Sequence, residues 1–142
     1  MATSLLANIL LREKQYEQAE ALIKPIYEYV DEPRPEVFEI LCYALLAQKK
    51  FQSLLTVAKE YKKYGEFVPG NILKFRGLAL IGLGKTDEAL AMADEALKQD
   101  PNNEIAQHLR REAEEAKEPW VQNLKQAQAK ENRDRRRYSN SN

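Results

Sequence analysis

The sequence is poor in the residues that build disulfide, metal and nucleophilic sites. It contains one cysteine, Cys42, and one histidine, His108, among 142 residues. A single cysteine excludes an internal disulfide. Zinc sites and Ser-His or Cys-His nucleophiles need several such side chains brought together. We therefore expect no metal, no cofactor and no enzymatic activity, and we interpret His108 as a surface residue.

Long apolar runs are also missing. No stretch approaches the roughly 20 apolar residues with which a helix crosses a bilayer, so we expect no membrane span. Residues 5–11 are largely apolar, but no basic leader precedes them and no small-residue cleavage site follows them. This argues against a secretory signal peptide. Together with the single cysteine, it favours a cytoplasmic protein.

Glycine and proline are scarce, with five and six residues, and β-branched residues are few. Leu, Ala, Glu and Lys dominate, and these side chains lose little freedom in a helix. The sequence therefore predicts an all-α protein. Apolar residues recur at helical spacing in seven segments, namely 2–13, 16–30, 35–48, 51–64, 71–83, 87–99 and 103–117.

Several residues indicate where these helices begin, end or bend. Pro25 lies inside the second segment, where we expect a kink or an early end because proline removes a backbone hydrogen bond. Pro35 fits the first turn of the third segment. Gly65 can end the fourth segment in the left-handed conformation. Thr86 is the expected N-cap of the sixth segment, and residues 100–103 are expected to cap the seventh.

The segments repeat with a period of 35 residues, which pairs them into three helical hairpins. A hairpin of this length cannot bury its own apolar faces, so neighbouring hairpins must stack. The clearest sets of positions spaced by 35 are Leu10, Leu45 and Leu80; Ala7, Cys42 and Gly77; and Tyr16, Phe51 and Thr86.

Residues 73–103 add small packing residues, a turn glycine and a closing proline at fixed spacing: Gly77, Gly84, Ala89, Ala96 and Pro101. This pattern resembles the tetratricopeptide repeat (TPR) family. Residues 1–34 and 35–69 match it more weakly, with Leu54 and Tyr61 at positions where the family has small residues. The resemblance implies a right-handed superhelix of three TPR-like helical hairpins plus a C-terminal capping helix, within a domain of residues 1–118.

The resemblance also implies a concave groove lined by the first helix of each hairpin. Asn71 is a further position on the first helix of the third hairpin, and His108 and Glu112 of the seventh segment are expected at one end of the groove. The four aliphatic positions of this groove are equally compatible with packing inside the domain, whereas Tyr43 is the best candidate for a groove residue because its hydroxyl needs a polar end. The expected groove residues are Asn8, Leu11, Arg12, Glu39, Tyr43, Leu46, Lys74, Leu78 and Ile81.

Residues 119–142 form a basic tail, with six Lys or Arg against two acids, a net charge of +4. Because the chain is neutral overall, residues 1–118 carry −4. We expect this tail to be partly helical or disordered, with Trp120 docked on the domain and residues 133–142 disordered. Its cations could contact RNA, an acidic partner or a membrane surface, or simply be solvated. The candidate tail residues are Arg133, Arg135, Arg136 and Arg137.

The leading hypothesis is therefore an adaptor or small chaperone that binds a peptide segment of a partner protein in the groove. A secretion-type chaperone is one form of it. An apolar floor with a polar rim suits such a ligand. One alternative is a nucleic-acid-associated scaffold that uses the basic tail. Another is a self-associating structural module, a homo-oligomer formed through the end repeats.

Overall fold

The computed structural model describes residues 2–61, 70–117 and 119–140. Within these ranges the regular secondary structure is helical, with no strand, which confirms the all-α class. The helices are α1 (Ala2–Arg12), α2 (Tyr16–Tyr29), α3 (Pro35–Ala47), α4 (Phe51–Tyr61), α5 (Gly70–Gly82), α6 (Thr86–Gln99), α7 (Glu104–Lys117) and α8 (Pro119–Asn140).

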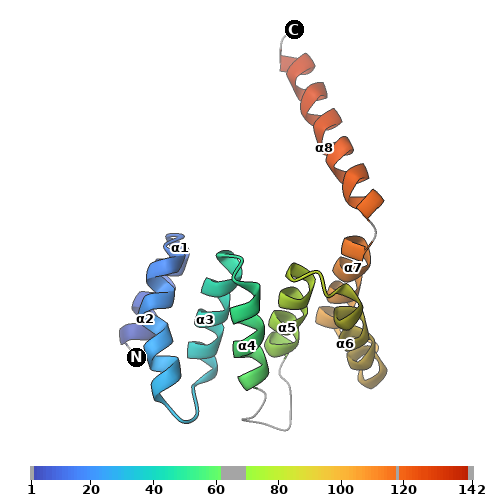
Figure 1. The fold of residues 1–142 in the computed structure, drawn as a ribbon. Helices are drawn as coiled ribbons and strands as arrows, with labels where there is room; N and C mark the ends of the chain where they lie inside the picture. The colour runs from blue at the N-terminus through green and yellow to red at the C-terminus, as the bar shows by residue number, and fades with distance from the viewer. Residues whose placement is uncertain (1, 62–69, 118, 141–142) are drawn as a thin grey trace.

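Helices α1 to α7 stand side by side in a row, and α8 runs away from the end of α7 (Figure 1). Each helix of the row packs against the next along the chain. In addition, α1 contacts α3, α3 contacts α5, and α5 contacts α7. The odd-numbered helices therefore form a continuous layer, and each even-numbered helix packs on the two odd-numbered helices beside it.

The turns that join α1 to α2, α3 to α4 and α5 to α6 share one backbone geometry. Each contains a residue with positive φ: Lys14 (61°), Lys49 (59°) and Gly84 (79°). This is a Schellman motif, in which the amide of the residue after the left-handed one donates a hydrogen bond to the carbonyl oxygen five residues before it. The turns thus recur at the 35-residue spacing of the sequence. The amide-to-carbonyl pairs are Gln15 to Leu10 (2.8 Å), Lys50 to Leu45 (3.0 Å) and Lys85 to Leu80 (2.8 Å).

The helix boundaries confirm some sequence-based expectations and correct others. Pro35 is the first residue of α3. Asn103 caps α7, since its Oδ1 accepts a hydrogen bond from the amide of Ala106 (3.1 Å). Thr86 is not a cap: it is the first residue of α6, whose N-cap is Lys85, and no side chain caps the helix. The cap shifts because the preceding turn already places Lys85 at the helix start.

Pro25 does not end α2, contrary to one of the two expectations for it. The helix continues to Tyr29. Ile23 is fully buried and Tyr27 is 8% exposed, one turn of helix apart on either side of the proline. Burial of these two side chains outweighs the loss of one backbone hydrogen bond.

The core runs through the row as two clusters of buried apolar side chains. The larger joins the three hairpins around Phe38, Leu41 and Phe75. The smaller joins α5, α6 and α7 around Leu73 and Leu109. A stack of this kind is stabilised by contacts between neighbours rather than by one central core.

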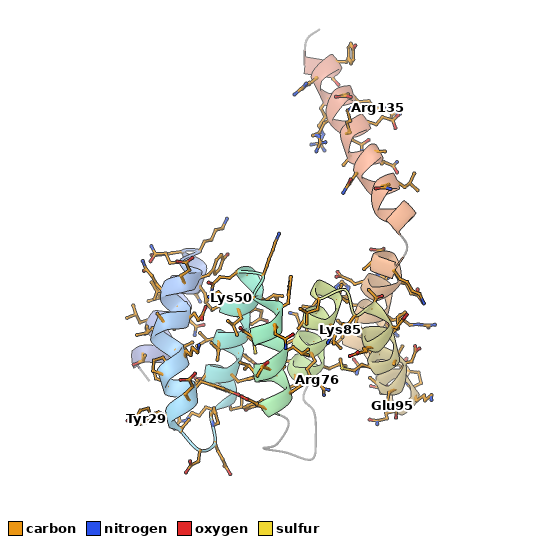
Figure 2. The ribbon with its side chains drawn as sticks, viewed as in Figure 1. Tyr29, Lys50, Arg76, Lys85, Glu95 and Arg135 are labelled. Carbon is orange, nitrogen blue, oxygen red and sulfur yellow. The ribbon has the colours of Figure 1, made fainter. Side chains whose placement is uncertain are left out.

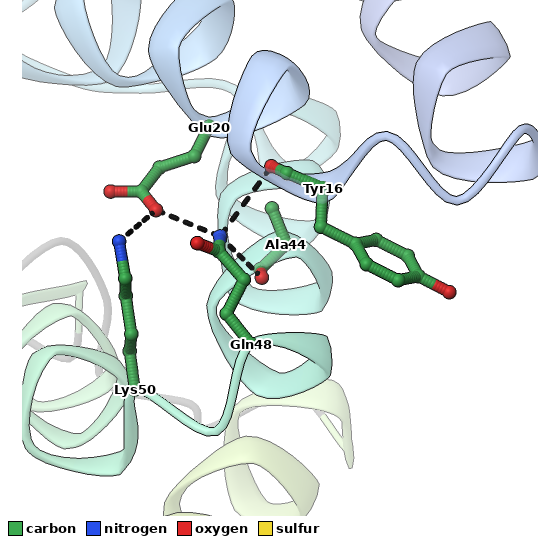
Figure 3. A network of polar contacts seen from close by, with 5 residues as sticks. All are labelled: Tyr16, Glu20, Ala44, Gln48 and Lys50. Carbon is green, nitrogen blue, oxygen red and sulfur yellow. Dashed lines mark hydrogen bonds and ion pairs between the residues drawn. The ribbon is translucent and has the colours of Figure 1, made fainter.

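A polar network fastens the first hairpin to the second (Figure 3). The side-chain amide of Gln48 donates to Oε1 of Glu20 (2.8 Å) and to the carbonyl oxygens of Ala44 (2.9 Å) and Tyr16 (3.4 Å). Lys50 forms an ion pair with the same Glu20 oxygen at 2.9 Å. Burial opposes ionisation of Glu20, but the bonds from Lys50 and Gln48 and the charges of Lys50 and Lys24 outweigh it, so the pKa of Glu20 is lowered.

The basic tail is more ordered than its sequence suggested. The expected disorder of residues 133–142 is wrong as far as Asn140, because α8 is helical to that residue. Lys, Arg, Gln and Ala favour helices, and Arg135 pairs with Glu131 one turn earlier at 2.8 Å. The expected ending at Gly65 and the docking of the Trp120 side chain both lie outside the described residues.

No helix in the described part of the chain combines the length and the apolar character needed to cross a membrane.

The shared turn geometry makes a prediction about stability. Lys49 adopts a left-handed conformation that costs a residue with a side chain roughly 1–2 kcal/mol and costs glycine little. Lys49→Gly should therefore raise the free energy of unfolding by about 0.5–1 kcal/mol, and Gly84→Ala should lower it by about 1 kcal/mol. Urea denaturation measures both. As the matched control, Lys59→Gly inside α4 should destabilise; stabilisation there would show that the left-handed turn is not the cause.

The Glu20 network makes a prediction about pH. The pKa of Glu20 in the folded chain lies below its ordinary value of 4.5. The network therefore stabilises the fold at pH values above 4.5, and this stabilisation is lost as the pH falls through the folded pKa. Glu20→Gln should thus reduce the unfolding free energy at about pH 7 but not at about pH 3. Glu28→Gln, an exposed change on the same helix, should not show this loss. A destabilisation by Glu20→Gln that is equal at both pH values would contradict the assignment.

Candidate partner-binding face

The layer of odd-numbered helices carries a group of polar and aromatic side chains at the α3–α5 junction. Glu39 of α3 accepts a hydrogen bond from the side-chain amide of Asn71 of α5. The amino group of Lys74 lies over the Tyr43 ring, 5.3 Å from its centre. At an exposed site such a cation–π contact contributes about 0.5–1 kcal/mol. These contacts hold side chains of two successive hairpins in fixed relative positions.

Tyr43 is the exposed end of an aromatic cluster. Its ring meets the ring of Phe75 edge-on, with centres 5.0 Å apart and an interplanar angle of 85°. Phe75 in turn meets Phe38 edge-on at 6.0 Å, and Phe38 stacks on Tyr61 at 4.1 Å. Phe38 and Phe75 are buried, whereas Tyr43 is 40% exposed. The cluster therefore positions one aromatic ring at the surface with little freedom to move.

A hollow of about 330 Å³ lies between α5 and α7 on this layer. Leu109 is buried, and Leu78 and Ile105 are half-buried. Lys74 lines the same hollow, so it connects the hollow to the Tyr43 ring. The α5/α7 hollow is lined by Lys74, Leu78, Glu104, Ile105, His108 and Leu109.

The hollow depends on the close approach of α5 and α7. A Cβ atom added at Gly77 would lie 2.6 Å from both methyl carbons of Leu109, and one added at Gly70 would lie 2.7 Å from Cδ1 of Ile105. These distances are far below van der Waals contact. Glycine at both positions therefore brings the α7 side chains close to α5, as the sequence suggested for Gly77.

The structure divides the expected groove residues into two groups. Asn8, Arg12 and Tyr43 are exposed, and Glu39 and Lys74 are half-buried in the contacts given above. The aliphatic residues are half-buried and pack mainly inside the domain. Leu11, Leu46 and Ile81 pack against the larger core cluster and Leu78 against the smaller one. The expected apolar strip is thus narrower than the sequence suggested.

Contacts join the face across α3, α5 and α7 but do not extend it to α1. Among the described residues, no hydrogen bond or ion pair connects Asn8 or Arg12 to the rest of the group. At the opposite end, Nε2 of His108 and Oε1 of Glu112 lie 3.1 Å apart on α7. The candidate face therefore lies on the second and third hairpins and α7.

Sequence reasoning missed three contributors to this face: Phe75, Glu104 and Ile105. The buried Phe75 supports the Tyr43 ring, and the other two residues line the hollow. The spacing of Gly70 and Gly77 was the available signal. Two glycines seven residues apart mark one side of a helix where another helix can approach closely.

The tail residues lie apart from this face. Arg133, Arg135, Arg136 and Arg137 are exposed on α8, and Figure 2 shows Arg135 far from the odd-numbered layer. Helix α8 follows α7 and runs away from the row of helices (Figure 1). The tail cations therefore form a separate surface.

The described residues contain no group of three or more His, Cys, Asp or Glu side chains that could hold a metal ion. Cys42 is fully buried. Burial, with a smaller effect of the Glu39 charge, raises the pKa of its thiol far above the usual range. A buried thiol in this state is a poor nucleophile.

Comparison of the chain with protein-family profiles, with curated proteins and with solved structures finds no match.

The close approach at Gly77 can be tested by a double-mutant cycle. Gly77→Ala should lower the free energy of unfolding by about 1–3 kcal/mol because the new methyl group meets Leu109. Leu109→Ala makes room for it, so the double variant should be more stable than the sum of the two single effects predicts. Urea denaturation of the four proteins measures this coupling. Additive effects would show that the two residues do not touch.

Proposed function

We propose that this chain is a TPR-like adaptor or small chaperone that holds a peptide segment of a partner protein. The observation that carries the proposal is the exposed Tyr43 ring, connected by Lys74 to the α5/α7 hollow. Surface aromatic rings held in place by packing are common at the centres of protein interfaces. The proposal concerns binding rather than catalysis.

The arrangement of helices supports the TPR-like part of the proposal. Three turns of the same geometry recur every 35 residues, and the odd-numbered helices form one layer. Three TPR-like hairpins in a right-handed superhelix, with α7 as the capping helix, would have these features. In that arrangement the layer of odd-numbered helices is the concave side, which is where Tyr43 and the hollow lie.

The chemistry of the hollow suggests what the ligand is like. Its aliphatic floor suits one apolar side chain, whose burial would contribute roughly 1.5–3 kcal/mol. Lys74, Glu104 and His108 surround this floor and offer hydrogen bonds to the backbone of a peptide. An extended or helical segment with one apolar anchor beside Tyr43 fits this combination. A secretion-type chaperone in the cytoplasm is one specific form of the proposal.

Affinity purification from native cells tests the proposal. The wild-type chain should retain a stoichiometric partner that mass spectrometry identifies, and Tyr43→Ser should weaken that complex by roughly 30-fold or more, the usual effect of removing a central aromatic anchor. Titration calorimetry with the identified segment measures the change. Thermal unfolding shows whether the variant is folded.

Tyr29→Ser is the matched control. Tyr29 is 92% exposed at the end of α2 and points away from the row of helices (Figure 2). The same substitution there should leave affinity unchanged. Equal affinity of the Tyr43 variant and the wild-type chain, or equal losses in both tyrosine variants, would refute the binding face.

A second candidate function rests on α8, which carries six Lys or Arg against two acids and projects from the row. A basic helix of this kind can bind nucleic acid through phosphates. If it does, nucleic acid should co-purify in place of a protein partner, and removal of residues 118–142 should abolish that binding. The dependence on salt would then be steep.

A further inference from the structure

Helix α1 exposes three large apolar side chains on one side. Leu5 is 65% exposed, Leu6 is 49% and Ile9 is 41%. Residues three and four apart are neighbours on a helix surface, so Ile9 lies beside both Leu6 and Leu5 and the three form one patch. We call this patch the α1 face.

The residues equivalent to the α1 face in the other two hairpins can be identified from the 35-residue repeat. In the second hairpin the equivalent residues are Ile40, Leu41 and Ala44, which are 3%, 2% and 0% exposed. In the third hairpin Phe75 and Ala79, equivalent to Leu5 and Ile9, are both 0% exposed, whereas Arg76, equivalent to Leu6, is half-buried. The face is therefore a stacking surface that the second and third hairpins bury.

The helix contacts show which elements lie against the equivalent faces of α3 and α5. Helix α3 contacts α1 and α2, and α5 contacts α3 and α4. Each equivalent face thus lies against helices of the preceding hairpin. Helix α1 packs on α2 and α3, at the end of the row (Figure 1). No described helix covers the α1 face.

Charge indicates which partner suits this face. From Ala2 to Leu11, α1 contains no charged residue, and Arg12 is its last residue. A strongly acidic or basic partner would find no complementary charge there. Two copies of this uncharged face can meet without bringing like charges together and without burying an unpaired charge.

We propose that two copies of this chain associate through their α1 faces, with Leu5, Leu6 and Ile9 of each copy packed against the same residues of the other. A contact in which both copies use the same patch has two-fold symmetry and closes at a dimer. The dimer buries Leu5, Leu6 and Ile9, although against a different surface from the one that buries the equivalent residues within the chain. Because the patch is small, the complex is weak. This inference does not rest on the proposed peptide-binding function, since Tyr43 and the α5/α7 hollow lie on other helices.

Sedimentation velocity of the full chain tests the dimer over about 1 µM to 1 mM, the range in which small interfaces associate. The wild-type chain should shift from monomer to dimer as concentration rises. Leu5→Glu and Ile9→Glu should each weaken the dimer at least tenfold, because they place two like charges in the contact. Both positions are exposed in the monomer, so circular dichroism should show unchanged helix content.

Tyr29→Glu is the matched control, since it adds the same charge at another exposed large side chain. It should dimerise like the wild-type chain. A wild-type chain that stays monomeric over the whole range would overturn the proposal. So would a dimer that survives both α1 substitutions, or one that Tyr29→Glu weakens equally.

Cross-linking tests which residues meet. Cys42 is fully buried, so its thiol does not react with the cross-linker. Ile9→Cys therefore introduces an accessible thiol at the α1 face. A short bis-maleimide should link two Ile9→Cys copies, and an excess of unmodified wild-type chain should suppress the product by forming mixed dimers. Tyr29→Cys should give no such product. Cross-linking at position 29 but not at position 9 would place the contact elsewhere and refute the α1 assignment.

Discussion

The turn with one left-handed residue is the constraint on which the rest of this structure depends. It ends one helix and starts the next within three residues, so the two helices of each hairpin lie antiparallel and close. Because the turn recurs every 35 residues, each hairpin presents the same side to the next. The same geometry is formed by Lys14 and Lys49 as by Gly84, which means that packing of the hairpins outweighs the local backbone preference at two of the three turns.

That constraint separates three surfaces on one small chain. The odd-numbered helices form a layer on which Tyr43 and the α5/α7 hollow lie. The end of the row leaves the α1 face without a covering helix among those described. Helix α8 carries its cations away from both. Such a separation is a property of stacked repeats, in which each unit contacts only its neighbours and each end differs from the middle. A peptide ligand, a second copy and a polyanion would therefore each have a site of their own.

The fold class was predictable because it depends on local patterns. Helical spacing of apolar residues, the cap at Asn103 and the proline at the start of α3 each act within a few residues of sequence. Expectations failed where packing decided the outcome. Pro25 stays helical because Ile23 and Tyr27 are buried beside it, and the cap of α6 lies at Lys85 because the turn before it fixes the backbone. The candidate site was predicted in part: Tyr43 and Lys74 were identified, but the roles of Phe75, Glu104 and Ile105 depend on contacts between helices far apart in sequence.

By itself, the sequence determined the helical class, the 35-residue period and the small residues at which helices approach, because these follow from spacing and side-chain size. Only the tertiary structure decided which aliphatic residues are exposed. Leu5 and Ile40 are equivalent in the repeat and similar in chemistry, yet one is 65% exposed and the other 3%. The physical reason is that burial depends on the neighbour a residue meets, and in a stack that neighbour comes from another hairpin.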